Sequence, residues 1–115
     1  MYRQVRLGNK YGAVRQTYNG VNYHSKLEAR YAYELDMRKR AKQIKDWQGQ
    51  YKISFDVNGV HICNYYVDFL VTHNDDSKEL VETKGFETDI YRFKRRLLEA
   101  IFLPEHPEFS YTVVK

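Results

Sequence analysis

Two acidic residues and a lysine in the middle of the chain have the types and the spacing for metal-dependent phosphate chemistry. Asp68 lies inside an apolar run at residues 65–71, and Glu82 and Lys84 lie in a second one at residues 80–84. Side chains alternate along a strand, so Glu82 and Lys84 are expected to share one face. Carboxylates bind divalent metal ions, and an adjacent lysine suits phosphate chemistry.

The segment between the two runs predicts how they pair. Residues 73–78 are polar and typical of a turn. If the strands form a hairpin centred on Asp75, Asp68 stands directly opposite Glu82. Facing residues have Cβ atoms roughly 5 Å apart, and like charges there destabilise a sheet. The pairing therefore predicts a divalent metal ion that holds the two carboxylates together.

These residues also have ordinary structural interpretations. Asp68 could be an edge-strand aspartate in solvent, although aspartate is depleted in strands. Glu82 and Lys84 could form a solvated strand face. The combination of all three residues at matching register favours a site.

Glu28 has two interpretations, and the residues alone leave both open. Residues 25–28, Ser-Lys-Leu-Glu, form a capping box, in which the serine caps a helix and the glutamate reaches back. Glu28 also lies on the same side of the expected helix as Tyr31 and Leu35, which faces inward. From there its carboxylate could reach the acids on the sheet.

The composition predicts an intracellular globular domain. The chain has 115 residues, of which 43% are hydrophobic and 30% charged, which indicates a folded soluble protein. We find no signal peptide and no apolar run long enough to span a membrane. Cys63 is the only cysteine, so an internal disulfide is excluded and a reducing, cytoplasmic compartment is expected.

The charge distribution predicts a polyanionic partner. The net charge is +4, and residues 1–27 contain no acidic residue. The 11 tyrosines suit interfaces and stacking against bases. Candidate DNA contacts are Arg3, Arg6, Lys10, Arg15 and Lys26 in one group and Arg92, Lys94, Arg95 and Arg96 in the other.

Periodicity and turn residues predict the order hairpin, helix, three strands, helix and strand. Residues 1–16 show no period and are interpreted as a flexible basic arm, and residues 17–115 as a single domain. The predicted elements are a hairpin at 17–23 with its turn at Asn19-Gly20, a helix from Ser25 to about Lys42, strands at 50–55, 61–72 and 78–84, a helix from Thr88 or Asp89 to about Leu103 ended by Pro104, and a strand at 109–114.

This order predicts a mixed α/β domain with a central sheet of about four strands and flanking helices. The second helix carries two apolar stripes, which we expect to pack against the sheet and against a partner subunit. The stripes are Ile90, Phe93, Leu97 and Ile101 on one side and Tyr91, Leu98 and Phe102 on the other.

Asp68 followed by Glu82-Thr83-Lys84 resembles the signature of the PD-(D/E)XK nuclease superfamily, with Val67 where the signature has proline. The element order resembles the restriction-endonuclease-like core of that superfamily. Two narrower families are also similar: the bacteriophage endonuclease I family of Holliday junction resolvases, and a family of small phage-encoded nuclease-like proteins. The matching segments are 24–28, 66–70, 81–85, 95–98 and 105–108 for the first family, and 9–12 and 18–21 for the second.

The resemblance implies a Mg²⁺-dependent DNA endonuclease, with Mn²⁺ able to substitute. It implies Asp68, Glu82, Glu28 and the Thr83 backbone carbonyl as metal ligands, and Lys84 as the residue that orients the attacking water. It further implies branched DNA as substrate, 5′-phosphate products, a homodimer and a phage protein made in a bacterial host.

Other functions stay open at this point. Nicking, restriction-like and transposase-subunit nucleases have similar patterns, and a basic DNA-binding module could retain an inactive site. The presence of all the acidic and lysine positions argues against the inactive module.

Overall fold

The computed structural model describes residues 16–115, and the chain divides into two compact units, residues 1–43 and 44–115. Of the arm predicted for residues 1–16, only Gln16 lies within the described part, at the start of a strand. Arg3, Arg6, Lys10 and Arg15 lie outside it. The single domain predicted for residues 17–115 stays a prediction.

The first unit opens with the predicted hairpin. Strands β1 (Gln16–Tyr18) and β2 (Val21–Tyr23) pair antiparallel around Asn19 and Gly20. Both turn residues have positive φ, 52° and 80°, which is the requirement of a type I′ turn. The asparagine–glycine pair therefore determines this turn locally.

Helix α1 (Lys26–Arg40) follows, and Ser25 caps it. The Glu28 backbone N–H donates to Ser25 Oγ at 3.1 Å, which satisfies one of the free donors of the first turn. Ala32 and Leu35 are fully buried. The last turn is basic, which complements the negative end of the helix dipole.

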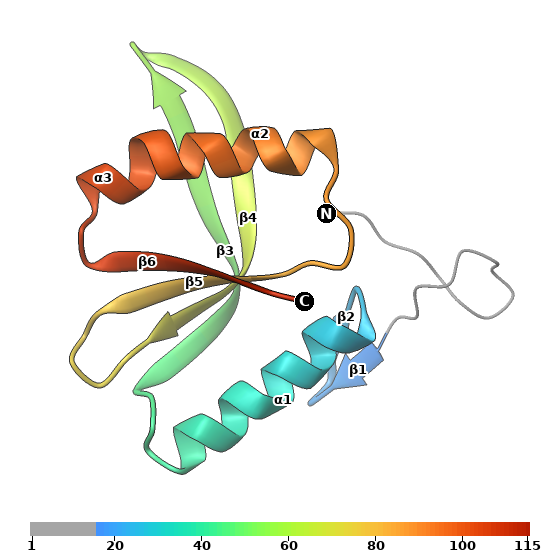
Figure 1. Ribbon diagram of the computed structural model, residues 1–115. Helices are drawn as coiled ribbons and strands as arrows, with labels where there is room; N and C mark the ends of the chain where they lie inside the picture. Colours follow the sequence, from blue (N-terminus) through green and yellow to red (C-terminus); the bar gives the residue numbers. More distant parts are fainter. Residues whose placement is uncertain (1–15) are drawn as a thin grey trace, which may run out of the picture. The chain divides into compact units, whose positions relative to one another are not determined.

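The second unit is built on a four-stranded mixed sheet in the order β3-β4-β5-β6 (Figure 1). Its strands are β3 (Asp46–Val57), β4 (Val60–Thr72), β5 (Lys78–Thr83) and β6 (Phe109–Val114). The first three strands pair antiparallel, and β6 joins β5 in parallel. The mixed α/β class predicted from the sequence is therefore confirmed.

The β4–β5 register is the one predicted from the turn. Phe69 pairs with Val81 and Leu70 with Leu80, so Asp68 and Glu82 come next along the two strands. The connection is closed by a hydrogen bond from His73 N–H to Ser77 O at 2.9 Å.

Strand β3 is longer than the predicted 50–55. It begins at Asp46, and Gln50 within it has a φ of 53°, in the left-handed region. This residue interrupts the alternation of the strand, which explains why the sequence pattern suggested a later start. The pairing on either side places Gln50 opposite Asp68, between the pairs Gly49–Phe69 and Tyr51–Val67.

The second helical segment starts as predicted and ends later. Helix α2 (Asp89–Leu97) is capped by Thr88, whose Oγ1 accepts from Tyr91 N–H at 3.1 Å. It continues through a π-helical turn (Leu98–Phe102) into α3 (Leu103–Glu105). The predicted end at Pro104 was wrong, because Pro104 lies in the first turn of α3, where a proline needs no N–H.

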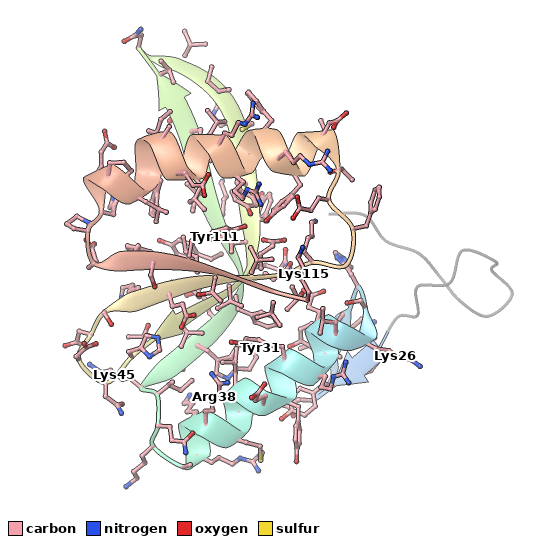
Figure 2. The ribbon with its side chains drawn as sticks, in the orientation of Figure 1. Lys26, Tyr31, Arg38, Lys45, Tyr111 and Lys115 are labelled. Carbon is pink, nitrogen blue, oxygen red and sulfur yellow. The ribbon has the colours of Figure 1, made fainter. Side chains whose placement is uncertain are left out.

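Helix α2 crosses one face of the sheet (Figure 1) and packs through the predicted Tyr91 and Leu98 stripe. Both side chains are buried in a core that includes Tyr65, Leu70 and Leu80. Figure 2 shows Tyr111 of β6 in the layer between this helix and the sheet.

The other apolar stripe of this helical segment is only partly buried. Leu97 and Ile101 are half-buried, whereas Ile90 and Phe93 are 66% and 53% exposed. Among the helices of residues 16–115, none has the length and apolar content needed to cross a membrane.

Candidate active site

Asp68 is buried in the middle of the sheet. Its Oδ2 accepts two hydrogen bonds from Thr83, one from the backbone N–H at 2.9 Å and one from Oγ1 at 2.8 Å. Its Oδ1 is also buried but has no hydrogen-bond partner among residues 16–115. Burial raises the pKa of the carboxyl, and the Thr83 hydrogen bonds and the Lys84 charge counteract part of that rise.

Glu82 of β5 is 1% exposed. Its Oε1 accepts a hydrogen bond from the Tyr65 hydroxyl at 3.1 Å. Burial, followed by the charge of Asp68, raises the pKa of Glu82 to about 8, although Lys84 opposes the shift. The single charge of Lys84 therefore does not offset the burial of Glu82 and the neighbouring carboxyl of Asp68.

Lys84 contributes one positive charge beside the two acids. Its Nζ lies 3.9 Å from Glu82 Oε2 and 4.5 Å from the centroid of the Tyr91 ring, within cation–π range. Its backbone N–H donates to Val114 O at 2.8 Å, so β6 fixes the end of β5. The sheet thus brings Asp68, Glu82 and Lys84 together on adjoining strands.

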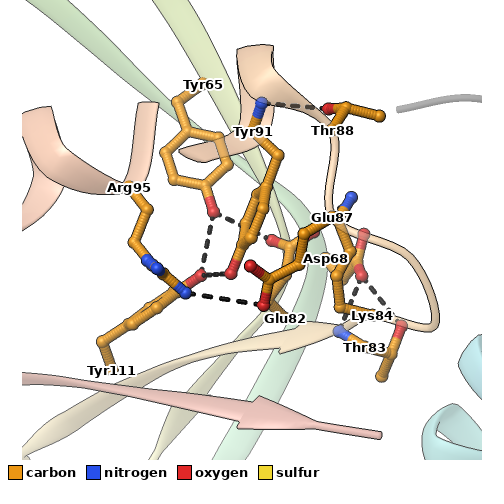
Figure 3. Close-up of polar contacts among 10 residues, drawn as sticks. All are labelled: Tyr65, Asp68, Glu82, Thr83, Lys84, Glu87, Thr88, Tyr91, Arg95 and Tyr111. Carbon is orange, nitrogen blue, oxygen red and sulfur yellow. Dashed lines mark hydrogen bonds and ion pairs between the residues drawn. The ribbon is translucent and has the colours of Figure 1, made fainter. Parts of the chain in front are cut away.

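Three tyrosines continue the site away from Glu82 (Figure 3). The Tyr65 hydroxyl lies 3.1 Å from the Tyr111 hydroxyl, which lies 2.7 Å from the Tyr91 hydroxyl. Burial raises the pKa of Tyr65 and Tyr111, so both stay protonated. The residues come from β4, β6 and α2, and only the high tyrosine content of the sequence could have pointed to them.

The predicted basic residues of α2 differ in their surroundings. Arg92 and Arg95 both approach Glu87, with closest distances of 3.6 Å. Arg96 is exposed and Lys94 is half-buried. Glu87 lies in the loop before the helix, and no motif of the sequence pointed to it.

Two other predicted residues belong to the first unit. Lys26 is exposed at the start of α1. Glu28 is 3% exposed, and its Oε1 accepts from His24 N–H at 3.0 Å. Ser25 caps the helix as predicted, and the Glu28 carboxylate reaches back to His24, one residue before the cap; the role of Glu28 in a metal site stays a prediction.

A protein-family model described as "Protein of unknown function (DUF1064)" matches residues 8–114. The chain belongs to this family. No curated protein and no solved structure gives a match to the chain.

In this member of the DUF1064 family, few side chains on the sheet could bind a metal ion. Within residues 16–115, no three side chains of Asp, Glu, His or Cys gather as a metal site. Magnesium binds through one or two carboxylates and keeps several waters, so a carboxylate pair is sufficient. A divalent ion bound here would give the unpartnered Oδ1 of Asp68 a partner and would favour the ionised form of Glu82.

Proposed function

We propose that the chain is a Mg²⁺-dependent DNA endonuclease that hydrolyses phosphodiester bonds, with Mn²⁺ able to replace Mg²⁺. The observation that supports this most is the buried Asp68 Oδ1 without a partner, beside Glu82 and Lys84. Two buried acids and one lysine form an arrangement that is unfavourable by itself and becomes favourable when a cation binds.

The residues of this chain that would hold the ion are Asp68, through its free Oδ1, and Glu82. The Thr83 backbone carbonyl and Glu28 are the further ligands implied by the resemblance to the PD-(D/E)XK superfamily. A bound divalent ion would polarise a water molecule and neutralise charge on the phosphate.

The surrounding residues hold these groups in place. Thr83 fixes Asp68 Oδ2 through two hydrogen bonds, which leaves Oδ1 as the available donor atom. Tyr65 fixes Glu82 Oε1. Lys84 lies between Glu82 and the Tyr91 ring. In this proposal it would orient the attacking water and offset charge that develops in the transition state.

The substrate and the assembly are part of the same proposal. We expect branched DNA, cut with 5′-phosphate products by a cytoplasmic homodimer, because cutting both strands of a junction requires two active sites. The exposed Ile90 and Phe93 of α2 support a partner subunit on that face. Basic residues of α2 and of the N-terminal segment would bind the DNA phosphates.

The test is cleavage of a labelled four-way junction by the purified chain with Mg²⁺, Mn²⁺, Ca²⁺ or a chelator, with a linear duplex of the same sequence alongside. We expect cutting with Mg²⁺ and Mn²⁺ only, and faster cutting of the junction. Asp68→Asn and Lys84→Ala should each reduce the rate by about 100-fold or more while DNA binding persists. Lys52→Ala, which removes an exposed lysine of β3, is the matched control.

The outcomes separate the alternatives. Equal cutting of junction and duplex would indicate a nuclease of other specificity, such as a nicking or restriction-like enzyme. DNA binding that is the same with chelator, without cutting of any substrate, would indicate an inactive DNA-binding module. Cutting by Lys84→Ala at the rate of the unaltered protein would refute the role given to that lysine.

A further inference from the structure

Three cations surround the carboxylate of Glu87, in the loop between Lys84 and α2. Glu87 Oε1 lies 3.6 Å from Arg92 Nε, and Glu87 Oε2 lies 3.6 Å from Arg95 Nη1 and 3.9 Å from Lys115 Nζ. Two of the cations come from α2, and the third, Lys115, follows β6 in the sequence. Folding therefore gathers this cluster from separate parts of the chain.

The distances show that Glu87 makes no short hydrogen bond to any of the three cations. Charge-assisted hydrogen bonds are about 2.7–2.9 Å long, and arginine commonly binds a carboxylate through two such bonds. All three distances to Glu87 are longer, and Oε2 is shared by two cations. Arg92 also donates to Asp89 at 3.0 Å, and the charge of Glu99 also acts on Arg95. The cations are thus shared among several carboxylates, and none of them makes a short contact with Glu87.

A backbone phosphodiester can bind the same cations as the carboxylate of Glu87 does. Its two non-bridging oxygens share one negative charge and can accept two hydrogen bonds from one arginine. Arg92 and Lys115 are 50% and 70% exposed, so an incoming anion can reach them. Glu87 lies on a loop that also contains the exposed Gly85, which has open space around its Cα.

The cluster is also connected to the candidate active site. The guanidinium of Arg95 lies 5.6 Å from the centroid of the Tyr91 ring, and Lys84 Nζ lies 4.5 Å from the same centroid (Figure 3). Both cations therefore lie against the Tyr91 ring, so the cluster adjoins the candidate active site.

We propose that Arg92, Arg95 and Lys115 form a binding seat for a backbone phosphodiester of the DNA substrate, and that Glu87 occupies this seat until DNA displaces it. The proposal rests on the proposed function for its ligand. In the proposal Glu87 competes with DNA for the three cations. Removing its charge should therefore strengthen DNA binding.

Glu87→Gln keeps the size of the side chain and removes the competing charge. We expect it to tighten DNA binding several-fold and to make the slope of log K against log salt steeper by up to about 0.9. Arg95→Gln should weaken binding and make the slope shallower. If Glu87 served instead to organise the cations, Glu87→Gln would weaken binding, so the two roles predict opposite signs.

Fluorescence anisotropy with a labelled four-way junction, in Ca²⁺ or chelator at several salt concentrations, measures both quantities without cleavage. Glu87→Ala serves as a second variant, and Glu105→Gln, at an exposed carboxylate of α3, as the control. A parallel series measures protection of each protein against thermal unfolding by inorganic phosphate. Circular dichroism verifies that the variants are folded.

Unchanged or weaker junction binding by both Glu87 variants overturns the proposal. A gain in protection by inorganic phosphate without a gain for DNA overturns the assignment of the ligand to the DNA backbone. Because none of these measurements needs cutting, they can support the seat even if the protein fails to cleave any substrate. They can equally overturn it in an active nuclease.

Discussion

The carboxylate pair should make the metal-free protein less stable as the pH rises. Burial and the charge of Asp68 raise the pKa of Glu82 to about 8, from an ordinary value of 4.5. Between these values the folded state keeps a proton that the unfolded state releases. The contribution of Glu82 is therefore fully present below pH 4.5 and is lost as the pH rises through about 8.

The size of the effect follows from the same two values. One proton of difference changes the free energy of unfolding by about 1.4 kcal/mol for each pH unit. Integrated between pH 4.5 and about 8, Glu82 accounts for a loss on the order of 5 kcal/mol. Such a loss is a large fraction of the stability of a small domain, typically 5–15 kcal/mol.

Glu82→Gln replaces the protonated carboxyl by a neutral group of similar size and removes the titration. We expect the variant and the unaltered protein to be similarly stable near pH 5. The variant should then gain relative stability toward pH 8, by up to about 1.4 kcal/mol per pH unit. Mg²⁺ should stabilise the unaltered protein at pH 8 and leave Glu82→Gln nearly unaffected, because the ion needs the ionised carboxylate.

Urea denaturation in chelator at a series of pH values measures this difference, and Trp47, the only tryptophan, provides the fluorescence signal. Glu105→Gln, at an exposed carboxylate, should run parallel to the unaltered protein at every pH. If the free energy of unfolding of Glu82→Gln also changes with pH as that of the unaltered protein does, Glu82 does not hold the proton. The electrostatic description of the site would then be wrong.

Three further changes test neighbouring parts of the structure. Thr83→Val removes the Oγ1 hydrogen bond to Asp68 and should lower the free energy of unfolding by about 1.5–3 kcal/mol; an unchanged urea midpoint would contradict that contact. Tyr65→Phe removes the donor to Glu82 Oε1, which should cost about 1–2 kcal/mol and move the pH transition of stability upward, whereas a downward move would be inconsistent with the hydrogen bond. Phe93→Ser, at an exposed position of α2, should convert a homodimer into a monomer in sedimentation velocity, and an unchanged assembly would exclude this face as the interface.

Much of the fold was predictable because its signals are local. The pair Asn19 and Gly20 alone determines a type I′ turn, and Thr88 and Ser25 begin the two long helices as caps. The end of the second helix was not predictable in the same way. A π-helical turn precedes Pro104 and lets the helical path pass through it, and packing decides whether such a turn forms.

The acidic pair was predictable because hairpin register follows from the turn. The polar segment centred on Asp75 places Asp68 opposite Glu82, and the pairing of Leu70 with Leu80 agrees with that register. The left-handed Gln50 was not predictable, because glutamine has no preference for that conformation and only pairing across the sheet places it opposite Asp68.

The sequence by itself therefore determined the order of the elements, the turns and the pairing of two acids, since each depends on residues close together in the chain. Only the tertiary structure decided the surroundings of those acids: the unpartnered oxygen of Asp68, the tyrosines behind Glu82 and the cations around Glu87. These contacts join β4, β5, β6 and α2 across large sequence separations. Their energies depend on burial, which no local pattern specifies.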